Sequence, residues 1–595
     1  MIFFAKKIVV CTKVRTYFRR IPCLLKTNKG VPKYNKFSKF ASFSAIYLHI
    51  SKKSSTFAAN WYHLNIYAHM LIKIYSAAPV GIEAVKVTIE VHAKPGFDFI
   101  MVGLPDTSVK ESHERIMAAL TVNGLEALHR SYTINLAPAD IKKEGALYDL
   151  PLAIGMLAGG EKMKAKDLGR YMMVGELSLD GSLQPIRGAL PIALCARKAG
   201  FKGLILPEVN AEEAAVVDGL EVYGLKNLME VIRFLNGEPK DELNPEDQFE
   251  PTQVDTQKLF DELAFPTDVD FSDVRGQFKV RRAVEIAAAG GHNMIMIGPP
   301  GAGKSMIAKR IPTILPPLTL EEALETTKIH SIVGLTNKRK GASSSLIVQR
   351  PFRSPHHTIT DTALVGGGQN PHPGEISLAH NGVLFLDELP EYKRSALEVM
   401  RQPLEDRHIT VARTKETVDY PASFMLVAAM NPCPCGHYGE NNPAHPCTCT
   451  PAQVHRYMSK ISGPLMDRID IQCEIEAVPY DQLRDNQPGE TSAAIRERVL
   501  KARAIQTERF KHSKLVHCNA MMNTKMVRQY CALDEESDKL LEYTMTKLGF
   551  SARAYDRILK VARTIADLDG SENIHKKHML EAISYRSLDR NNYAG

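Results

Sequence analysis

The chain has 595 residues, of which 44% are hydrophobic and 24% are charged, and its formal net charge at pH 7 is +8. A length near 600 predicts roughly three or four domains, and the composition excludes collagen, wholesale disorder and an extended coiled coil. The sequence contains no uninterrupted apolar run of about 18 residues, so it predicts a cytoplasmic protein with no membrane partner.

The basic character of the chain lies in its first segment. Residues 1–69 hold thirteen Lys and Arg and no Asp or Glu, whereas the rest of the chain has 62 basic and 67 acidic side chains, a formal charge of −5. Three interpretations stay open: translation begins at Met70, where an alternating pattern starts at once, or the segment is a targeting sequence, or it is a functional basic arm. None of them makes the segment part of the fold.

Residues 70–236 predict one mixed α/β domain. Residues 85–91 alternate like a half-buried strand, residues 108–120 have helical spacing, and Gly203-Leu-Ile-Leu-Pro is typical of a buried strand that ends at a breaker. Residues 237–272 are rich in Pro and acidic side chains and predict a linker or an interdomain strap.

The remainder predicts an α/β core and a helical end. Strands and helices alternate over residues 273–478, and residues 479–595 are mainly helical, with an amphipathic stretch at 552–568. This order is typical of an α-helical lid that follows an α/β domain.

A phosphate-binding loop follows a predicted strand at residues 293–297. The next residues match G-x-x-x-x-G-K-[ST] and lead into a helix, which is the context that the motif requires. Backbone N–H groups and the helix N-terminus suit phosphate, Lys304 is expected to reach the terminal phosphates of ATP, and Ser305 is expected to ligate Mg²⁺. The predicted loop comprises Gly298, Pro299, Pro300, Gly301, Ala302, Gly303, Lys304 and Ser305.

Polar residues also end two later strands. An apolar run at 382–386 leads into Asp387 and Glu388, which predicts a Mg²⁺ contact through Asp387 and a water-polarising carboxylate at Glu388. A strand that merely ends in solvated acids is the alternative. A second apolar run ends at Asn431, which is placed to orient water or sense the γ-phosphate.

Four cysteines follow Asn431 in the pattern C-x-C-x₁₁-C-x-C. Four thiolates suit tetrahedral Zn²⁺, although this spacing is tighter than the usual C-x₂₋₄-C. His437 or His445 in place of one cysteine, reduced loop cysteines, and redox sensing stay open as alternatives. The four residues are Cys433, Cys435, Cys447 and Cys449.

Four strings in the second half of the chain are long enough to compare with known families. They are Arg-Pro-Phe-Arg-Ser-Pro-His-His-Thr-Ile-Thr at 350–360, Leu-Val-Gly-Gly-Gly at 364–368, Pro-Gly-Glu-Ile-Ser-Leu-Ala-His-Asn-Gly at 373–382 and Asn-Pro-Cys-Pro-Cys-Gly at 431–436. They resemble the magnesium-chelatase-like AAA+ ATPases of the YifB/ComM type. The resemblance implies a homo-oligomer, usually a hexameric ring with active sites shared between subunits. It also implies a helicase that acts on single-stranded or branched DNA and drives branch migration during natural transformation.

The resemblance assigns roles to residues that the pattern alone does not. Arg468 is implied as an arginine finger that reaches a neighbouring subunit's nucleotide, and Arg553 as a second sensor on the lid. The alternating residues 407–418 predict a hairpin whose turn carries Arg413 and Lys415. In this clade such a hairpin points into the ring pore, where its cations hold DNA phosphates, and a solvated hairpin is the alternative.

The first domain is similar to the Lon protease domain. The similarity lies in residues 175–188 and 199–207, and it implies a fold of the ribosomal-protein-S5 domain-2 type. Proteolysis there needs a nucleophilic Ser with a Lys base, but Leu152 stands about where the Ser should be. The domain is therefore expected to be non-proteolytic.

The predicted fold is α/β multidomain, with a Lon-protease-like first domain, a P-loop AAA+ core and an α-helical lid. The predicted function is an ATP-hydrolysing ring motor that acts on DNA. An ATP-dependent protein-remodelling ATPase or metal-chelatase-type chaperone is the alternative.

Overall fold

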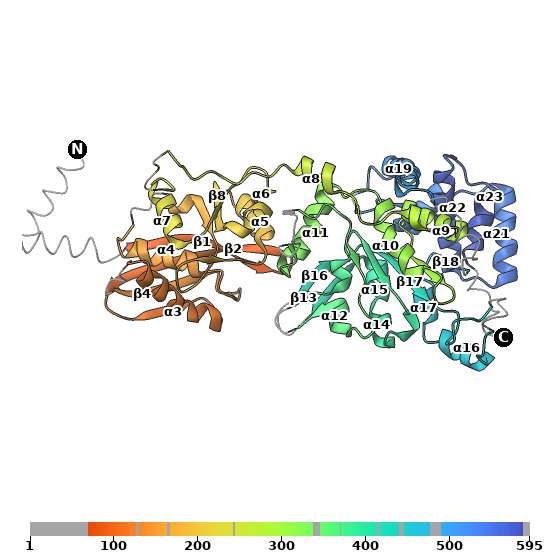
Figure 1. Ribbon diagram of the computed structural model, residues 1–595, viewed down its shortest axis with the longest axis horizontal. Helices are drawn as coiled ribbons and strands as arrows, with labels where there is room; N and C mark the ends of the chain where they lie inside the picture. Colours follow the sequence, from red (N-terminus) through yellow and green to blue (C-terminus); the bar gives the residue numbers. More distant parts are fainter. Residues whose placement is uncertain are drawn as a thin grey trace, which may run out of the picture. The chain divides into compact units, whose positions relative to one another are not determined.

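The computed structural model describes residues 70–125, 130–163, 167–241, 244, 246–336, 346–368, 371–412, 417–439, 446–476, 489–513 and 515–586 (Figure 1). Two larger sheets organise these residues. The first has seven strands and the second has five. The chain is thus of mixed α/β class, as the sequence predicts.

The seven-stranded sheet has the order β3-β4-β2-β1-β5-β8-β9. Strands β2 and β4 pair antiparallel, whereas β3 with β4, β1 with β5, β5 with β8, and β8 with β9 pair parallel. Its strands are β1 (Met70–Val80), β2 (Glu83–Pro95), β3 (Phe99–Val102), β4 (Arg130–Ala137), β5 (Tyr171–Met173), β8 (Gly203–Pro207) and β9 (Glu221–Leu225). The buried strand predicted at 203–207 is confirmed, with all five residues buried.

Helices pack on this sheet and form two hydrophobic core clusters with it. The helix predicted at 108–120 runs from Thr107 to Val122, capped by the Asp106 side chain on the N–H group of Val109 at 2.8 Å. A short hairpin of β6 (Glu176–Leu177) and β7 (Leu183–Gln184) lies beside it. The helices are α3 (Thr107–Val122), α4 (Asp149–Gly159), η2 (Leu168–Arg170), α5 (Ala189–Lys198), η3 (Glu208–Asn210), α6 (Ala211–Ala215) and α7 (Leu228–Asn236).

The segment predicted as a linker contains regular structure. Helix α8 (Thr256–Leu263) starts at the Asp255 cap, and a short 3₁₀ turn η4 (Phe271–Asp273) follows. The sequence predicts a linker or an interdomain strap here, and within it Leu259, Phe260 and Leu263 of α8 pack against a core cluster. The sequence does not predict the helix itself, because its few apolar residues lie among prolines and acids.

The five-stranded sheet is parallel throughout, with the order β11-β14-β17-β10-β18. Parallel strands place their carboxyl ends at one edge, where ligands bind in open α/β sheets. Its strands are β10 (Met294–Ile297), β11 (Phe352–Arg353), β14 (Val383–Leu386), β17 (Met425–Met430) and β18 (Ile471–Glu474). Strands β10, β14 and β17 are wholly buried, as expected for a sheet covered on both faces.

Helices and two hairpins surround this sheet. The hairpins are β12 (Gly366–Gly367) with β13 (His372–Pro373), and β15 (His408–Ala412) with β16 (Thr417–Pro421). The helices are α9 (Phe278–Gly290), α10 (Lys304–Ile314), α11 (Leu320–Ile332), α12 (Asp361–Val365), α13 (Glu375–Leu378), η6 (Leu389–Glu391), α14 (Arg394–Val399), α15 (Arg401–Asp406), α16 (Pro451–Met458) and α17 (Gly463–Met466).

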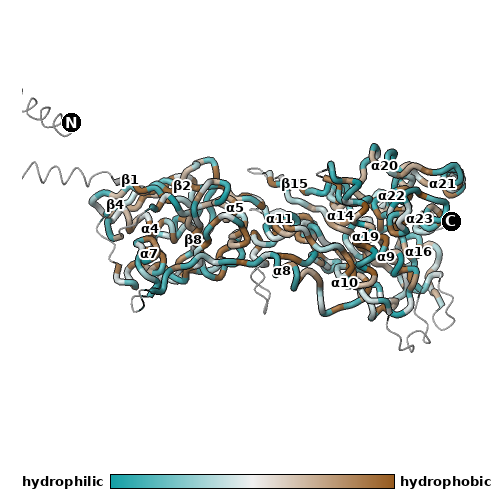
Figure 2. Tube along the Cα trace, turned by 90° about the horizontal axis from the view of Figure 1, so that it is seen from above, coloured by the Kyte–Doolittle hydropathy of each residue, from teal (hydrophilic) through white to brown (hydrophobic). Residues whose placement is uncertain are grey.

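The C-terminal part is helical, as predicted. Brown and teal alternate along α21 and α22 in Figure 2, as expected for helices with one buried face. The elements are α19 (Ser492–Arg509), η7 (Asn519–Met521), α20 (Thr524–Tyr530), α21 (Glu535–Leu548), α22 (Ala552–Leu568) and α23 (Lys576–Ser584). Among the described residues, no helix combines the length and the apolar character that a membrane crossing requires.

A buried polar network joins the helical part to β18. Asp470, just before β18, accepts a hydrogen bond from His292 at 3.0 Å and forms an ion pair with Arg557 of α22. The other ring nitrogen of His292 lies 2.8 Å from the hydroxyl of Thr564, also on α22. These contacts fix α22 beside the amino ends of β10 and β18, at the edge of the sheet opposite its carboxyl ends.

Candidate nucleotide-binding site

The phosphate loop connects β10 to α10. Gly303 has φ = +83°, a conformation that residues with a Cβ rarely adopt, and it lies directly before the first helical residue, Lys304. The turn therefore aims the N-terminus of an eleven-residue helix into the loop, where its free N–H groups and dipole favour an anion.

Lys304 is held across the loop. Its Nζ atom donates to the carbonyl oxygens of Gly298 at 2.6 Å and Pro299 at 2.9 Å, and to Oδ1 of Asn431 at 3.0 Å. Burial lowers the pKa of the ammonium, and the nearby carboxylate of Asp387 opposes that effect. Two of the residues predicted for the site, Lys304 and Asn431, are thus brought into direct contact.

Ser305 and Asp387 form the second direct contact. The Ser305 hydroxyl donates to Oδ2 of Asp387 at 2.6 Å. Strand β14 delivers Asp387, and β17 lies between β14 and β10 in the sheet. At the carboxyl ends of these three neighbouring strands, the Asp387 carboxylate, the Ser305 hydroxyl and the Lys304 ammonium therefore lie close together. Hydroxyl and carboxylate oxygens are ligands that Mg²⁺ prefers.

Glu388 adopts a strained backbone conformation. Its φ of +52° and ψ of +48° lie in the left-handed region, which is uncommon for a residue with a side chain and clusters at functional sites. Its carboxylate is 57% exposed and lies 3.3 Å from Nδ1 of His357. Sequence reasoning missed His357 as a site residue, because its contact with Glu388 depends on β11 lying beside β14.

A cavity of 370 Å³ adjoins Glu388 and Asn431. Helix α16 supplies one side of it, including Arg456, and Lys460, two residues beyond the helix, forms an ion pair with Glu391 at 3.0 Å. The backbone N–H group of Asn431 hydrogen-bonds to the Tyr457 hydroxyl, whose pKa burial raises to about 12. The sequence did not predict α16 as part of the site, because the residue pattern of the helix does not indicate that it packs near residues 388 and 431.

Arg468 is enclosed by its own chain. Its side chain is 8% exposed and pairs with Glu405 at 2.7 Å. The guanidinium also donates to the carbonyl oxygens of Arg401 at 3.0 Å and Pro464 at 2.6 Å. In this arrangement the side chain does not extend from the surface, so reaching another subunit's nucleotide would require these contacts to break.

Arg553 is placed differently. It is the second residue of α22, its side chain is 62% exposed, and it lies 3.6 Å from Oδ2 of Asp467. It therefore stands beside the segment that carries Arg468 and is free to move by rotamer change. Its role as a second sensor stays a prediction.

The predicted hairpin at 407–418 forms from β15 and β16, which pair antiparallel from His408 with Pro421 to Ala412 with Thr417. The predicted DNA-contacting residues, Arg413 and Lys415, lie outside the described residues. Their assignment stays a prediction.

Position 152 offers no nucleophile. Leu152 lies in α4, fully buried in the core of the first sheet. Lys143, nine residues before Leu152, is also buried. Its ammonium donates to the backbone carbonyl oxygens of Pro138 and Ile141. A Ser–Lys dyad of the proteolytic kind therefore has no nucleophile at this position.

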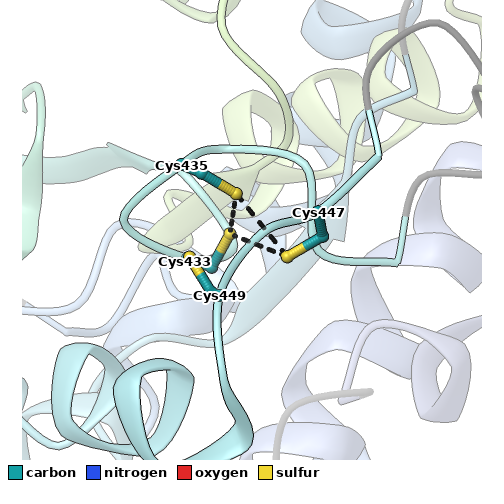
Figure 3. Close-up of side chains that lie close together, drawn as sticks. All are labelled: Cys433, Cys435, Cys447 and Cys449. Carbon is teal, nitrogen blue, oxygen red and sulfur yellow. Dashed lines mark hydrogen bonds between the residues drawn. The ribbon is translucent and has the colours of Figure 1, made fainter.

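The four predicted cysteines converge. The side chains of Cys433, Cys435, Cys447 and Cys449 point toward one another in Figure 3. Their sulfur atoms all lie within 4.8 Å of one another. They are free thiols in the structure. The backbone N–H group of His437 lowers the pKa of Cys435 to about 5. His437 is not among the residues that group here, and His445 lies outside the described residues.

Three family descriptions match successive parts of the chain. Residues 270–483 match "Magnesium chelatase, subunit ChlI", residues 89–210 match "Subunit ChlI of Mg-chelatase", and residues 489–586 match "Magnesium chelatase, subunit ChlI C-terminal". The match over 270–483 contains the phosphate loop, Asp387, Glu388 and Asn431. The fold and these matches define a magnesium-chelatase-like AAA+ protein, a class that implies ATPase activity with ATP and Mg²⁺.

Two relatives match over most of their length. The protein YifB of Escherichia coli strain K12 is 45% identical over 519 residues, which cover 87% of this chain and 97% of YifB. The competence protein ComM of Haemophilus influenzae is 44% identical over 522 residues, with the same coverage of 87% and 97%. The chain belongs to the YifB/ComM-type family.

A shorter similarity links the chain to proteases. Lon protease 2 of Bacillus subtilis is 28% identical over 137 residues, which cover 23% of this chain and 24% of that protein. Partial similarity of this extent agrees with the expected Lon-like domain, and the geometry at Leu152 explains how such a domain would lack proteolysis.

Proposed function

We propose that this chain is an ATP-hydrolysing AAA+ motor that acts on DNA as a ring of identical subunits. Its work would be branch migration in support of DNA integration during natural transformation or recombination. ATP and Mg²⁺ are its cofactors, and single-stranded or branched DNA is its substrate.

The single observation that carries the ATPase part is the convergence of four side chains at the carboxyl ends of three parallel strands, two from the start of α10 and one after each of β14 and β17. Lys304 lies 3.0 Å from Asn431, and Ser305 lies 2.6 Å from Asp387. In the proposed mechanism, Lys304 and the backbone N–H groups of α10 neutralise the terminal phosphates. Ser305 and Asp387 hold Mg²⁺, and Glu388 and Asn431 orient the attacking water.

A resting arrangement is implied by the contacts of Lys304. Its ammonium is satisfied by two loop carbonyls and Asn431, so nucleotide binding would exchange these partners for phosphate oxygens. The strained backbone at Glu388 holds its carboxylate beside His357. We infer that His357 restrains Glu388 until the γ-phosphate is in place.

Two observations support the DNA part. The H. influenzae relative is named as a competence protein, and β15 and β16 pair antiparallel, as the predicted hairpin requires. Arg413 and Lys415 in its turn would hold the DNA backbone phosphates. The ring arrangement is proposed because the AAA+ class commonly forms one. In such a ring, Arg553, or Arg468 after its ion pair with Glu405 breaks, would complete the nucleotide site of the neighbouring subunit.

The deciding experiment is steady-state ATP hydrolysis by the full chain with no DNA, with single-stranded DNA and with a branched junction. Lys304→Ala is the blank. The double change Arg413→Ala with Lys415→Ala tests the hairpin, and Lys501→Ala with Lys539→Ala, two exposed helix lysines, is the charge-matched control.

The proposal expects DNA to stimulate hydrolysis, and expects the hairpin change to abolish that stimulation while the control retains it. Hydrolysis that ignores every DNA tested would contradict the DNA motor. It would favour a protein-remodelling or metal-chelatase-type ATPase, which nothing in the described geometry otherwise favours.

A further inference from the structure

We propose that Cys433, Cys435, Cys447 and Cys449 bind one structural Zn²⁺ ion, and that this ion holds the 431–450 loop against the phosphate loop. The second half of the proposal rests on the proposed nucleotide site, whereas the first half does not. The zinc would then set the affinity for ATP without touching the nucleotide.

The donor set fits zinc in number, type and spacing. The sulfur atoms of Cys433 and Cys435 lie 3.3 Å apart, those of Cys435 and Cys447 3.5 Å, and those of Cys433 and Cys447 3.8 Å. Four thiolates about 2.3 Å from a tetrahedral zinc ion lie ~3.8 Å from one another. A disulfide requires about 2.05 Å, so the cluster matches a metal better than a pair of crosslinks.

The cluster is built from both ends of one loop. Cys433 and Cys435 follow directly after β17 and Asn431, and Cys449 immediately precedes Thr450, the N-cap of α16. A metal between them therefore ties the end of β17 to the start of α16. The same two elements meet again where the Asn431 N–H group bonds to Tyr457.

The cluster also touches the phosphate loop. Gly436, one residue beyond Cys435, has φ = +91°, and a Cβ built there would lie 2.6 Å from Cδ and 2.8 Å from Cγ of Pro300. The backbone at 436 thus packs directly on the loop that is proposed to bind phosphate. Residues 431, 434 and 436 join the phosphate loop, the cavity beside Glu388 and the metal ligands in one short segment.

The position of the 431–450 loop is therefore expected to depend on the bound metal. Residues 432–450 contain only turns and bends in their described part, so backbone hydrogen bonding alone holds them weakly. Four metal–sulfur bonds would remove the conformational freedom of such a loop. Without these metal–sulfur bonds, Gly436 would no longer pack on Pro300 and the position of Asn431 would no longer be fixed. Lys304 would then lose one of its hydrogen-bond acceptors.

The first test is the metal itself. Full-length protein purified without added metal is analysed by plasma mass spectrometry, alongside Cys447→Ser and a matched control, Cys195→Ser, which lies outside the cluster. The expected result is one zinc per chain in the unmodified protein and in the control, and its loss in Cys447→Ser. Unmodified protein that stays without metal after incubation with Zn²⁺ overturns the site.

A second measurement does not depend on a variant that folds. Metal-stripped full chain is titrated with Co²⁺ under reducing conditions, and the visible ligand-field bands of tetrahedral tetrathiolate cobalt are expected to saturate at one ion per chain. Octahedral Co²⁺ spectra, or no spectral change, would contradict four-cysteine coordination.

The third test addresses the contact with the phosphate loop. Gly436→Ala is expected to keep zinc and to weaken binding of a fluorescent ATP analogue about tenfold, because the added methyl group pushes on Pro300. Gly439→Ala is the matched control: its φ of +80° carries the same backbone strain, but a Cβ there meets nothing within 4 Å. Equal affinities for the two variants would overturn the support role.

Failure of this inference and failure of the proposed function give different results. Protein that contains zinc but binds no ATP analogue fails the proposed function and leaves the metal site intact. Protein whose affinity for the analogue is unchanged after zinc removal retains the nucleotide site and fails the support role.

Discussion

The Ser305 hydroxyl lies 2.6 Å from the Asp387 carboxylate, although 82 residues separate them in the chain. The contact joins the first turn of α10 to the end of β14. Each group alone is an ordinary polar side chain, but together they would supply two of the six oxygen ligands of an octahedral Mg²⁺ ion.

Asp387→Asn is expected to remove most of the magnesium dependence of ATP binding. A neutral amide is a weaker ligand for a hard divalent cation than a carboxylate, so affinity for Mg·ATP should fall roughly tenfold to a hundredfold. Affinity for ATP in EDTA should change little, which supplies the internal control. Isothermal titration with and without Mg²⁺ measures both, and an equal loss in the two conditions would argue against a metal role.

Glu388→Gln is expected to separate binding from hydrolysis. Loss of a water-polarising carboxylate lowers kcat by roughly 10²- to 10⁴-fold, whereas nucleotide affinity should be retained because Glu388 does not contact the phosphate loop in this arrangement. Single-turnover hydrolysis and binding of an ATP analogue measure the two effects. Glu391→Gln, another acid that lines the same cavity, is the matched control and should keep near-normal turnover.

Arg468→Ala is expected to lower stability as well as activity. Its guanidinium is buried, pairs with the half-exposed Glu405 and donates to two backbone carbonyls, and leaving those carbonyls without a donor costs roughly 1–3 kcal/mol. Thermal unfolding followed by circular dichroism should show a lower midpoint, whereas Arg528→Ala, an exposed arginine on α20, should not. An unchanged midpoint with abolished turnover would instead support the arginine finger that the sequence predicts.

Asp470→Asn is expected to destabilise the junction between β18 and α22. Burial by itself would raise the pKa of Asp470, but the charge of Arg557 and the hydrogen bond from His292 hold that pKa well below its usual range. The amide leaves Arg557 buried without its counter-charge, at a cost of roughly 3–5 kcal/mol in the free energy of unfolding. Glu535→Gln, in an exposed pair on α21, should cost less than about 0.5 kcal/mol.

The ion pair of Asp470 and Arg557 also predicts how the stability of the protein changes at low pH. A carboxyl group whose folded-state pKa is depressed adds stability above its unfolded-state pKa of about 3.9, and that stability is lost as the pH falls toward the folded-state pKa. The contribution of Asp470 should therefore be full at pH 6 and should decline below about pH 4. Asp470→Asn should flatten this part of the stability profile, measured by urea unfolding at several pH values. An unaltered acid limb in the variant would show that other carboxyl groups dominate it.

Local pattern predicted much of the fold and of the site. Residues 552–568 form α22 with the bounds that periodicity indicates, and Gly203–Pro207 forms β8, because each segment must bury one face whatever its neighbours are. The phosphate loop was identifiable for a similar reason, since its chemistry depends on a short contiguous segment. The helix at 256–263 was missed because its apolar residues are few and lie among prolines and acids.

The sequence by itself determined which segments form strands and helices, which side chains stand at strand ends, and that four cysteines lie close along the chain. Only the tertiary structure decided that β17 lies between β14 and β10, so that Asp387 meets Ser305 and Asn431 meets Lys304. It likewise decided that His357 faces Glu388, that Arg468 is enclosed, and that Gly436 rests on Pro300. The physical reason is that periodicity records which face of a segment avoids water, whereas the neighbour of that face is set by how the whole chain packs.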